Sequence, residues 1–306
     1  MKSKYEPLFD KVELPNGVEL RNRFVLAPLT HISSNDDGTI SDIELPYIEK
    51  RSQDVGITIN AASNVSDVGK AFPGQPSIAH DSDIEGLKRL ATAMKKNGAK
   101  ALVQIHHGGA QALPELTPDG DVVAPSPISL KSFGQKQEHS AREMTNEEIE
   151  QAIKDFGEAT RRAIEAGFDG VEIHGANHYL IHQLPIDYIH VSMMDTHATT
   201  REGKYAGQER LPLIHKWING RMPLIGIGSI FTADEALDAV ENVGVDLVAI
   251  GRELLLDYQF VEKIKDGRED EIINYFDPER EDNHHLTPNL WHQFNEGFYP
   301  LPRKDK

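Results

Sequence analysis

Three polar residues, His174, Asn177 and Tyr179, lie close together in the segment HGANHY. His174 and Asn177 are three residues apart, a spacing at which a turn leaving a strand can direct both side chains to one point. Two neutral hydrogen-bond donors at one point can hold a carbonyl or nitro oxygen while negative charge develops on it. Tyr179 follows two residues later and could deliver a proton. The alternative is that these are core polar groups that satisfy one another.

The last two predicted strand exits, Gly226-Ile227-Gly228-Ser229-Ile230 and Gly251-Arg252, suit a phosphate. Glycines let the backbone approach an anion closely, and an arginine adds a fixed positive charge. The segment TADE has the form of a capping box, which predicts a helix whose N-terminal amides point toward the same place. The alternative is that the glycines make tight turns and that Arg252 pairs with a surface carboxylate.

Seven short apolar runs predict the strands that position these residues. Most of the runs are rich in Val and Ile and nearly continuous in hydrophobicity, as is typical of parallel strands covered on both faces. The runs are Phe24–Leu29, Ile57–Ala61, Ala101–Ile105, Gly170–His174, Asp187–Ser192, Pro223–Ile227 and Val245–Ile250.

The stretches between these runs predict helices. Asp83–Asn97 has helical apolar spacing and stops at a glycine, Thr145–Ala166 begins with the capping box TNEE, and Thr232–Glu241 begins with TADE. Alternating strands and helices predict a parallel sheet, and at this length the best single-domain solution is a (β/α)8 barrel. We expect one domain over residues 1–306, with 277–306 as a tail packed on it. Active sites of such barrels form at the C-terminal ends of the strands, where the polar residues above lie.

One interval is too short for this barrel. Only GANHYLIHQLPI separates the strand ending at His174 from the strand starting near Asp187. Parallel neighbours need a crossover of roughly a dozen residues or more, usually through a full helix. The count of seven strands is also one short of the eight in a closed barrel. The sequence therefore predicts that about one β/α unit is missing around the fifth strand.

Composition narrows the classes of function. The chain has 306 residues, no cysteine and a formal net charge of −17. The absence of cysteine excludes disulfides, thiolate zinc sites and cysteine nucleophiles. No cluster of Lys and Arg supplies the basic face that nucleic-acid binding needs. Neither a signal peptide nor a membrane span is evident, so we expect a cytoplasmic protein. We also expect a small-molecule substrate. Whether the chain forms a homo-oligomer stays an open question.

Several segments in the right order resemble the Old Yellow Enzyme family of flavin oxidoreductases. They are the opening PLF…NGVELRNRFVLAP, the exits APLT and VQIHHGG, AFPGQP, EIHGANHYLIHQ and AIGRELL. The resemblance runs from about Tyr5 to the C-terminal region. It implies a TIM-type barrel that binds FMN non-covalently at its mouth, with NADH or NADPH as reductant.

The resemblance also assigns roles to residues. It implies that Pro28, Leu29 and Thr30 lie beside the flavin, that the backbone of Ala62 contacts the ring, and that the Gln104 amide reads the pyrimidine end. The positions that match phosphate contacts are Gly228, Ser229, Gly251 and Arg252. The pair His174 and Asn177 matches the anchor for the oxygen of an activated alkene, and Tyr179 matches the proton donor.

The chain departs from the family after Gln183. The family continues there with a loop, a Gly-Gly turn and a fifth strand that carries an arginine in contact with the flavin ring. Here His182-Gln183 runs straight into Leu184-Pro185. We expect the loss of this arginine to weaken FMN binding and the loss of the strand to expose the flanking strand edges.

Two other classes of function stay open. The first is a metal-dependent hydrolase on the same barrel, because imidazole is a common metal ligand. The histidines at predicted strand exits are His31, His106, His107, His174, His190 and His197. Against this class, the first strand has no His-x-His pair. The second is a catalytically inactive relative in which the incomplete barrel only binds a ligand.

Overall fold

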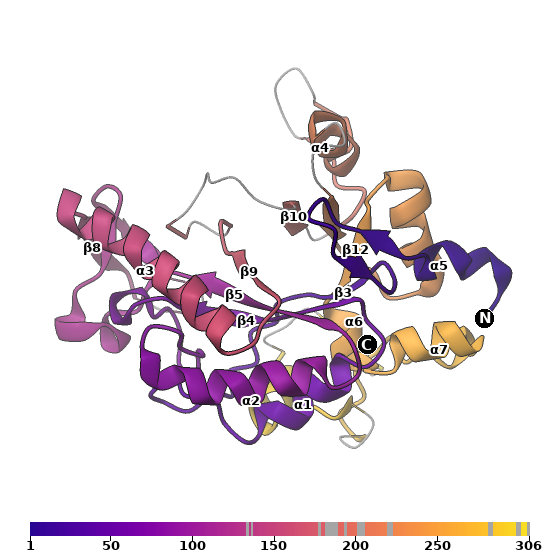
Figure 1. Ribbon diagram of the computed structural model, residues 1–306, viewed down its shortest axis with the longest axis horizontal. Helices are drawn as coiled ribbons and strands as arrows, with labels where there is room; N and C mark the ends of the chain where they lie inside the picture. The colour runs from indigo at the N-terminus through magenta and orange to yellow at the C-terminus, as the bar shows by residue number, and fades with distance from the viewer. Residues whose placement is uncertain are drawn as a thin grey trace.

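A computed structural model shows a parallel sheet that curls into an open barrel (Figure 1). It describes the chain apart from residues 133–134, 136, 177–178, 181–188, 193–194, 201–205, 219–222, 281–283, 298–300 and 305–306. The order of the strands is β10-β11-β12-β3-β4-β5-β9. Their bounds are β3 (Phe24–Leu26), β4 (Ile57–Asn64), β5 (Lys100–His106), β9 (Gly170–Ile173), β10 (Ile189–Ser192), β11 (Leu224–Ile227) and β12 (Leu247–Ile250). Each strand overlaps a predicted one, so the α/β class is confirmed.

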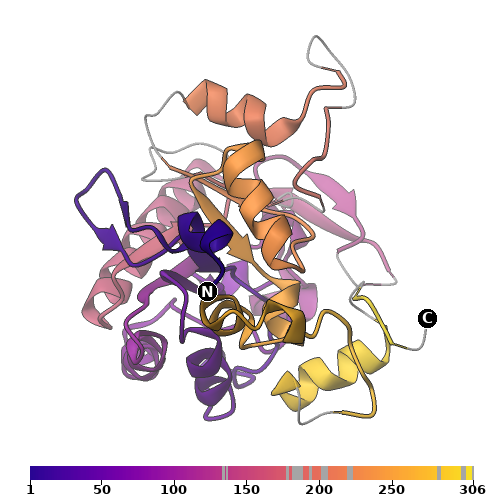
Figure 2. The ribbon, with the colours of Figure 1, turned by 90° about the vertical axis from the view of Figure 1, so that its right-hand side faces the viewer.

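Helices connect the strands and cover the outer face of the sheet, as the two views together show (Figures 1 and 2). The helices are α1 (Glu44–Arg51), α2 (Ile84–Lys95), α3 (Asn146–Glu165), α4 (Arg210–Ile218), α5 (Ala233–Asp238), α6 (Arg252–Leu256), α7 (Phe260–Asp266) and α9 (Pro288–Asn295). The predicted capping boxes are present: Thr145 with Glu148 begins α3, and Thr232 with Glu235 begins α5. The sequence therefore predicted where these two helices begin.

Two small sheets lie outside the barrel and were not predicted. The hairpin of β1 (Val12–Glu13) and β2 (Glu19–Leu20) precedes the first barrel strand. Between β5 and α3, the strands β6 (Val123–Ala124), β7 (Ile128–Leu130) and β8 (His139–Glu143) form a separate three-stranded sheet. These strands are two to five residues long. A period-2 pattern cannot be recognised over so few residues.

The barrel is open between β9 and β10. These two strands are the edges of the sheet, and in the described part of the chain neither pairs with the other. They are also consecutive along the chain, so the opening lies where the sequence predicted a missing β/α unit. Figure 1 shows the gap between the two labelled strands. The prediction of an incomplete barrel is therefore confirmed.

The strands separate two apolar regions. Along β3, Phe24 and Leu26 face the large core between the sheet and the helices, whereas Val25 belongs to the smaller cluster inside the barrel. This alternation follows from the period-2 geometry of a strand, which sends successive side chains to opposite faces. The strands that carry the polar residues are therefore fixed from outside by the large core between the sheet and the helices.

The C-terminal segment packs on the large core. Leu290 and Phe294 of α9 are 1% and 2% exposed and belong to that core. The buried Arg51 of α1 donates hydrogen bonds to the backbone carbonyls of His284 and His285. No helix among the described residues combines the length and the apolar character needed to cross a bilayer.

Candidate active site

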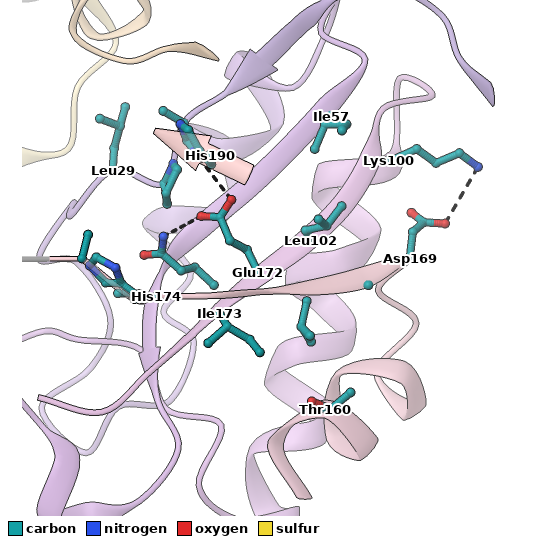
Figure 3. Close-up of a pocket in the computed structure, with 18 of the residues that line it drawn as sticks. Leu29, Ile57, Lys100, Leu102, Thr160, Asp169, Glu172, Ile173, His174 and His190 are labelled. Atoms are coloured by element: carbon teal, nitrogen blue, oxygen red, sulfur yellow. Dashed lines mark hydrogen bonds and ion pairs between the residues drawn. The ribbon is translucent and has the colours of Figure 1, made fainter. Parts of the chain in front are cut away.

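A cavity of about 920 Å³ runs along the inside of the sheet, reaches the C-terminal ends of the strands and extends past the open edge at β9 to α3. The predicted site residues that line it are Pro28, Leu29, Thr30, Ala62, Gln104, His174 and Tyr179. Figure 3 shows this cavity with His174 and Leu29 near one end and the Lys100–Asp169 ion pair at the other. The fold thus brings residues from four different strand exits to one cavity, as expected for a barrel enzyme.

Three aromatic rings meet beside the cavity, and two of them, those of His174 and Tyr179, line it. The centroid of the His174 ring is 4.9 Å from that of Tyr179 and 5.3 Å from that of His106. The rings of His106 and Tyr179 are 4.2 Å apart in an edge-to-face arrangement. Asn177, the predicted partner of His174, lies outside the described residues. The structure therefore brings together two of the three predicted catalytic side chains.

Burial sets the protonation of this cluster. It lowers the pKa of His174 to about 4, with a smaller opposing effect from the Glu172 carboxylate. Burial also lowers the pKa of His106 and raises the pKa of Tyr179. Near neutral pH the imidazole of His174 is uncharged and Tyr179 keeps its proton. A neutral N–H donor and a phenol are the two groups that the predicted chemistry requires.

The four predicted phosphate residues lie together at the ends of β11 and β12. Arg252 donates a hydrogen bond of 2.8 Å from Nη2 to the Ser229 hydroxyl. A Cβ added at Gly251 would lie 3.3 Å from Ile227 and 3.5 Å from Leu29, and both of these residues line the cavity. The predicted phosphate end therefore adjoins the cavity.

Two details of the predicted phosphate site differ from what the sequence led us to expect. A Cβ at Gly228 would lie 2.7 Å from the backbone of Asp195 and Thr196, so the chain itself occupies the space beside this glycine. The Glu235 carboxylate accepts from the amides of Phe231 and Thr232. These two amides are therefore used by the capping box of α5, and Arg252 is the clearest feature for an anion.

A match to a family model identifies the protein family of this chain. The model of the NADH:flavin oxidoreductase / NADH oxidase family matches residues 7–188 and 184–271. The chain belongs to this family. The two matched pieces meet at residues 184–188, which is where the sequence departs from the resemblance. An NAD(P)H-dependent flavin oxidoreductase with FMN as its cofactor is thereby confirmed, and so is the resemblance to the Old Yellow Enzymes.

Two curated relatives differ in the share of this chain that their alignments cover. It is 39% identical to the probable NADH-dependent flavin oxidoreductase YqiG of Bacillus subtilis (strain 168), over 378 aligned positions that cover 100% of both chains. The alignment is longer than the chain, so YqiG carries residues with no counterpart here. The NADH:fumarate oxidoreductase of Klebsiella pneumoniae (strain 342) is 43% identical over 178 residues, which are 58% of this chain and 19% of that protein.

Solved structures support the fold. Morphinone reductase in complex with tetrahydroNAD superposes with a TM-score of 0.70 at 21% identity, covering 92% of this chain and 97% of that chain. The old yellow enzyme homologue from Zymomonas mobilis superposes with a TM-score of 0.71 at 20% identity, covering 85% and 92%. At this identity the likeness shows the barrel fold alone.

Sequence reasoning missed the role of Gln75, which lies in the AFPGQP segment. Its Oε1 accepts from the Ala71 amide at 2.7 Å, so its Nε2 faces the other way. That Nε2 lies 3.0 Å from His106 Nδ1 and donates to the Ala62 carbonyl at 3.1 Å. His106 Nδ1 is therefore an acceptor, and its proton is on Nε2. Gln75 joins the backbone at Ala62 to the ring cluster beside the cavity.

Sequence reasoning also missed Glu172, whose carboxylate lies inside the barrel and lines the cavity (Figure 3). One oxygen accepts from Gln104 Nε2 at 2.6 Å, and the other lies 3.2 Å from His190 Nδ1. A signal for it was present, because a glutamate in the middle of the apolar run GVEIH is seldom fully buried without a partner.

The residues present fit the ring of FMN. The pairing of β4 with β5 shifts register between Asn60 and Ser63, so the backbone at Ala62 leaves the ladder where it lines the cavity. Bulges of this kind are frequent beside active sites. Pro28–Thr30 and the Gln104 amide line the same cavity, and they would hold the ring. The loss of the fifth-strand arginine, which the resemblance implies, stays a prediction.

In the part of the chain that the structure describes, no metal centre supports the metal-dependent alternative. That part contains no group of three or more His, Cys, Asp or Glu side chains placed to hold a metal ion. Instead, His197 lies between the carboxylates of Glu209 and Asp238, at 2.9 and 2.7 Å. Together with the family, these contacts favour a flavin site over a metal site.

Proposed function

We propose that this chain reduces an alkene activated by a carbonyl or carboxylate, with His174 and Asn177 holding the acceptor's oxygen and Tyr179 supplying the proton. The proposal is supported by one observation above all: His174 and Tyr179 meet on the cavity that Pro28 and Gln104 also line. Relatives named NADH:fumarate oxidoreductase and NADH:acrylate oxidoreductase point to α,β-unsaturated carboxylates as the acceptor class.

The protein's own side chains bind, polarise and protonate the acceptor. The neutral imidazole of His174 donates a hydrogen bond to the acceptor's oxygen, which withdraws electrons from the double bond. Tyr179, kept protonated by burial, donates its phenolic proton to the α-carbon. Hydride transfer from NAD(P)H to the β-carbon is the chemistry that bound FMN supplies. Pro28, Leu29, Thr30, Ala62 and Gln104 would hold its ring.

At the other end of the cofactor, Arg252 and Ser229 would bind the phosphate, with Gly228 and Gly251 shaping the backbone beside it. Arg252 and Ser229 already contact each other, which supports a shared ligand. We expect the open wall to leave FMN weakly bound in the isolated chain. The intact mass and visible spectrum of the purified protein measure this directly, and full flavin absorbance at unchanged mass would contradict it.

Turnover tests the catalytic assignment. FMN is added in excess, and NADH and NADPH oxidation is followed with acrylate, fumarate and cyclohexenone as acceptors. We expect His174→Ala to lower turnover of the acceptor by about 10²–10³-fold, as for loss of an oxyanion donor. Tyr179→Phe should lower the rate less, because solvent can protonate the product slowly. Equal turnover by His174→Ala would overturn the assignment.

A binding protein without turnover is the second candidate, and the open wall between β9 and β10 favours it. FMN would then bind, and no acceptor would accelerate NADH or NADPH oxidation. The same titration and assay separate the two candidates, because the first requires both binding and turnover.

A further inference from the structure

We propose that Glu172 is a positioning residue that orients the Gln104 amide for the pyrimidine end of the flavin, and that His190 holds Glu172 in place from across the open wall. The inference rests on the proposed function, because it takes Gln104 as a contact of the flavin. The sequence analysis did not name Glu172 as a site residue, and it named His190 only as a possible metal ligand.

The contact between Gln104 and Glu172 decides which way the amide points. The two residues are partners in the register of β5 and β9, and each is 7% exposed. An ionised carboxylate only accepts hydrogen bonds, so only the nitrogen of the amide can face it. The bond of 2.6 Å from Gln104 Nε2 to Glu172 Oε1 therefore turns the amide oxygen away from Glu172.

This orientation matches the chemistry of a flavin. The pyrimidine ring of the flavin has an N–H donor flanked by two carbonyl acceptors. An amide whose oxygen and second N–H both remain available can pair with a donor and an adjacent acceptor at once. If the amide were reversed, its oxygen would face the Glu172 carboxylate. Glu172 thus excludes the wrong orientation through repulsion between two acceptors.

His190 holds Glu172 from the far side of the opening. Its Nδ1 lies 3.2 Å from Glu172 Oε2, and the side chains are 10% and 7% exposed. The two residues come from β9 and β10, which are the edges of the sheet and do not pair in the described part of the chain. The contact therefore spans the opening with side chains where the backbone ladder is interrupted.

A second observation at His190 points to a ligand. Its Nε2 is buried and has no hydrogen-bond partner among the described residues, although the side chain lines the cavity. A buried ring nitrogen without a partner is costly, and a ligand atom would remove that cost.

FMN affinity tests the inference. Apo-protein is titrated with FMN and the quenching of flavin fluorescence is followed for the wild type, Glu172→Ala, Gln104→Ala and the double variant. We expect Glu172→Ala to bind FMN about tenfold more weakly, as for loss of a charged hydrogen bond. In the Gln104→Ala background the same change should have less than about a twofold effect, because contacts that act through one residue are not additive.

The isosteric variant Glu172→Gln keeps the volume and separates positioning from folding. It retains an acceptor for Gln104 and removes the negative charge, so we expect a smaller loss of affinity and a more positive reduction potential of the bound flavin. Glu150→Gln on the exposed face of α3 makes the same change in net charge and is the matched control. His190→Gln should weaken FMN binding less than Glu172→Ala does.

The outcomes are distinguishable. Wild-type affinity in Glu172→Ala, or an equal loss in the Gln104→Ala background, would overturn the inference and leave the proposed function intact. Wild-type affinity in Gln104→Ala would overturn the flavin contact itself, and the inference with it. Turnover by His174 and Tyr179 is measured separately and does not decide between these results.

Discussion

Two helices of the open barrel, α2 and α3, differ in how much of their apolar surface is covered. We call the side of α2 the closed flank and the side of α3, next to the opening, the open flank. On the closed flank, α2 packs its apolar side on the sheet, and Leu87, Leu90 and Met94 are fully buried. On the open flank, α3 exposes Ile153 and Ile164 to 68% and 56%. Both helices carry the apolar spacing of a barrel helix, and only one of them has neighbours on both sides.

The exposed large apolar residues of α3 form one stripe. Ile149, Ile153 and Ile164 lie on the same helical face, because they are separated by four and eleven residues. Thr160 and Ile164 also line the cavity, together with Val171 and Ile173 on the outer side of β9. Glu172 and Ile173 point to opposite sides of β9 in Figure 3. The comparison teaches that α3 and β9 retain the surface on which a following β/α unit would pack.

The largest effect is expected in the large core, to which Phe24 of β3 and the buried residues of α2 both belong. Phe24 is fully buried and packs edge-to-face on Phe9 at 5.4 Å and on Phe260 at 6.4 Å. Phe24→Ala should lower the free energy of unfolding by about 3–5 kcal/mol, because it leaves a cavity in the core. Ile164→Ala on the open flank is the matched control and should change it by less than about 0.5 kcal/mol. Urea unfolding measures both, and equal losses would contradict the comparison.

Restoring the missing unit should remove the difference between the flanks. The residues of the Bacillus relative that have no counterpart in this chain are inserted between Gln183 and Leu184. We expect FMN to bind about ten- to a hundredfold more tightly, since a charged hydrogen bond contributes about 1.5–3 kcal/mol. A Gly/Ser insertion of equal length is the control. If both insertions give the same FMN affinity by fluorescence titration, the missing wall does not limit binding.

The apolar stripe should make the open flank associate with itself. Ile153→Lys places a charge at its most exposed position, so we expect less self-association with nearly unchanged stability. Sedimentation velocity over a range of protein concentrations measures this effect. A wild-type chain that is monomeric at every concentration would show that the stripe does not mediate self-association.

The smallest effect is expected at His197, just after β10. Hydrogen bonds to the Glu209 and Asp238 carboxylates raise the pKa of this imidazole. A group whose pKa is raised in the folded state stabilises the fold below its unfolded value near 6.5 and loses that contribution as pH rises through the folded value. His197→Gln should therefore lower stability at pH 6 by a few tenths of a kcal/mol, since the site is solvent-exposed, and hardly at all at pH 9. Urea midpoints that shift equally at both pH values would contradict this.

Much of the fold could be predicted from the sequence because its signals are local. Buried parallel strands read as continuous apolar runs, so the segments around Phe24, Ile57 and Leu247 were found in advance. The length of the connection after His174 predicted the opening, because a crossover has a minimum length. The gathering of Gln104 and His174 at one cavity followed from the rule that strand exits meet at one end of a barrel.

The amino-acid sequence by itself determined the family, the strands and the place of the missing unit, because these depend on residue type and spacing along the chain. Only the tertiary structure decided that Gln75 reaches His106, that Glu172 lies between Gln104 and His190, and that α3 keeps an uncovered stripe. Those contacts join residues 18 to 68 positions apart. Side chains so distant in sequence meet only once the strands are arranged side by side.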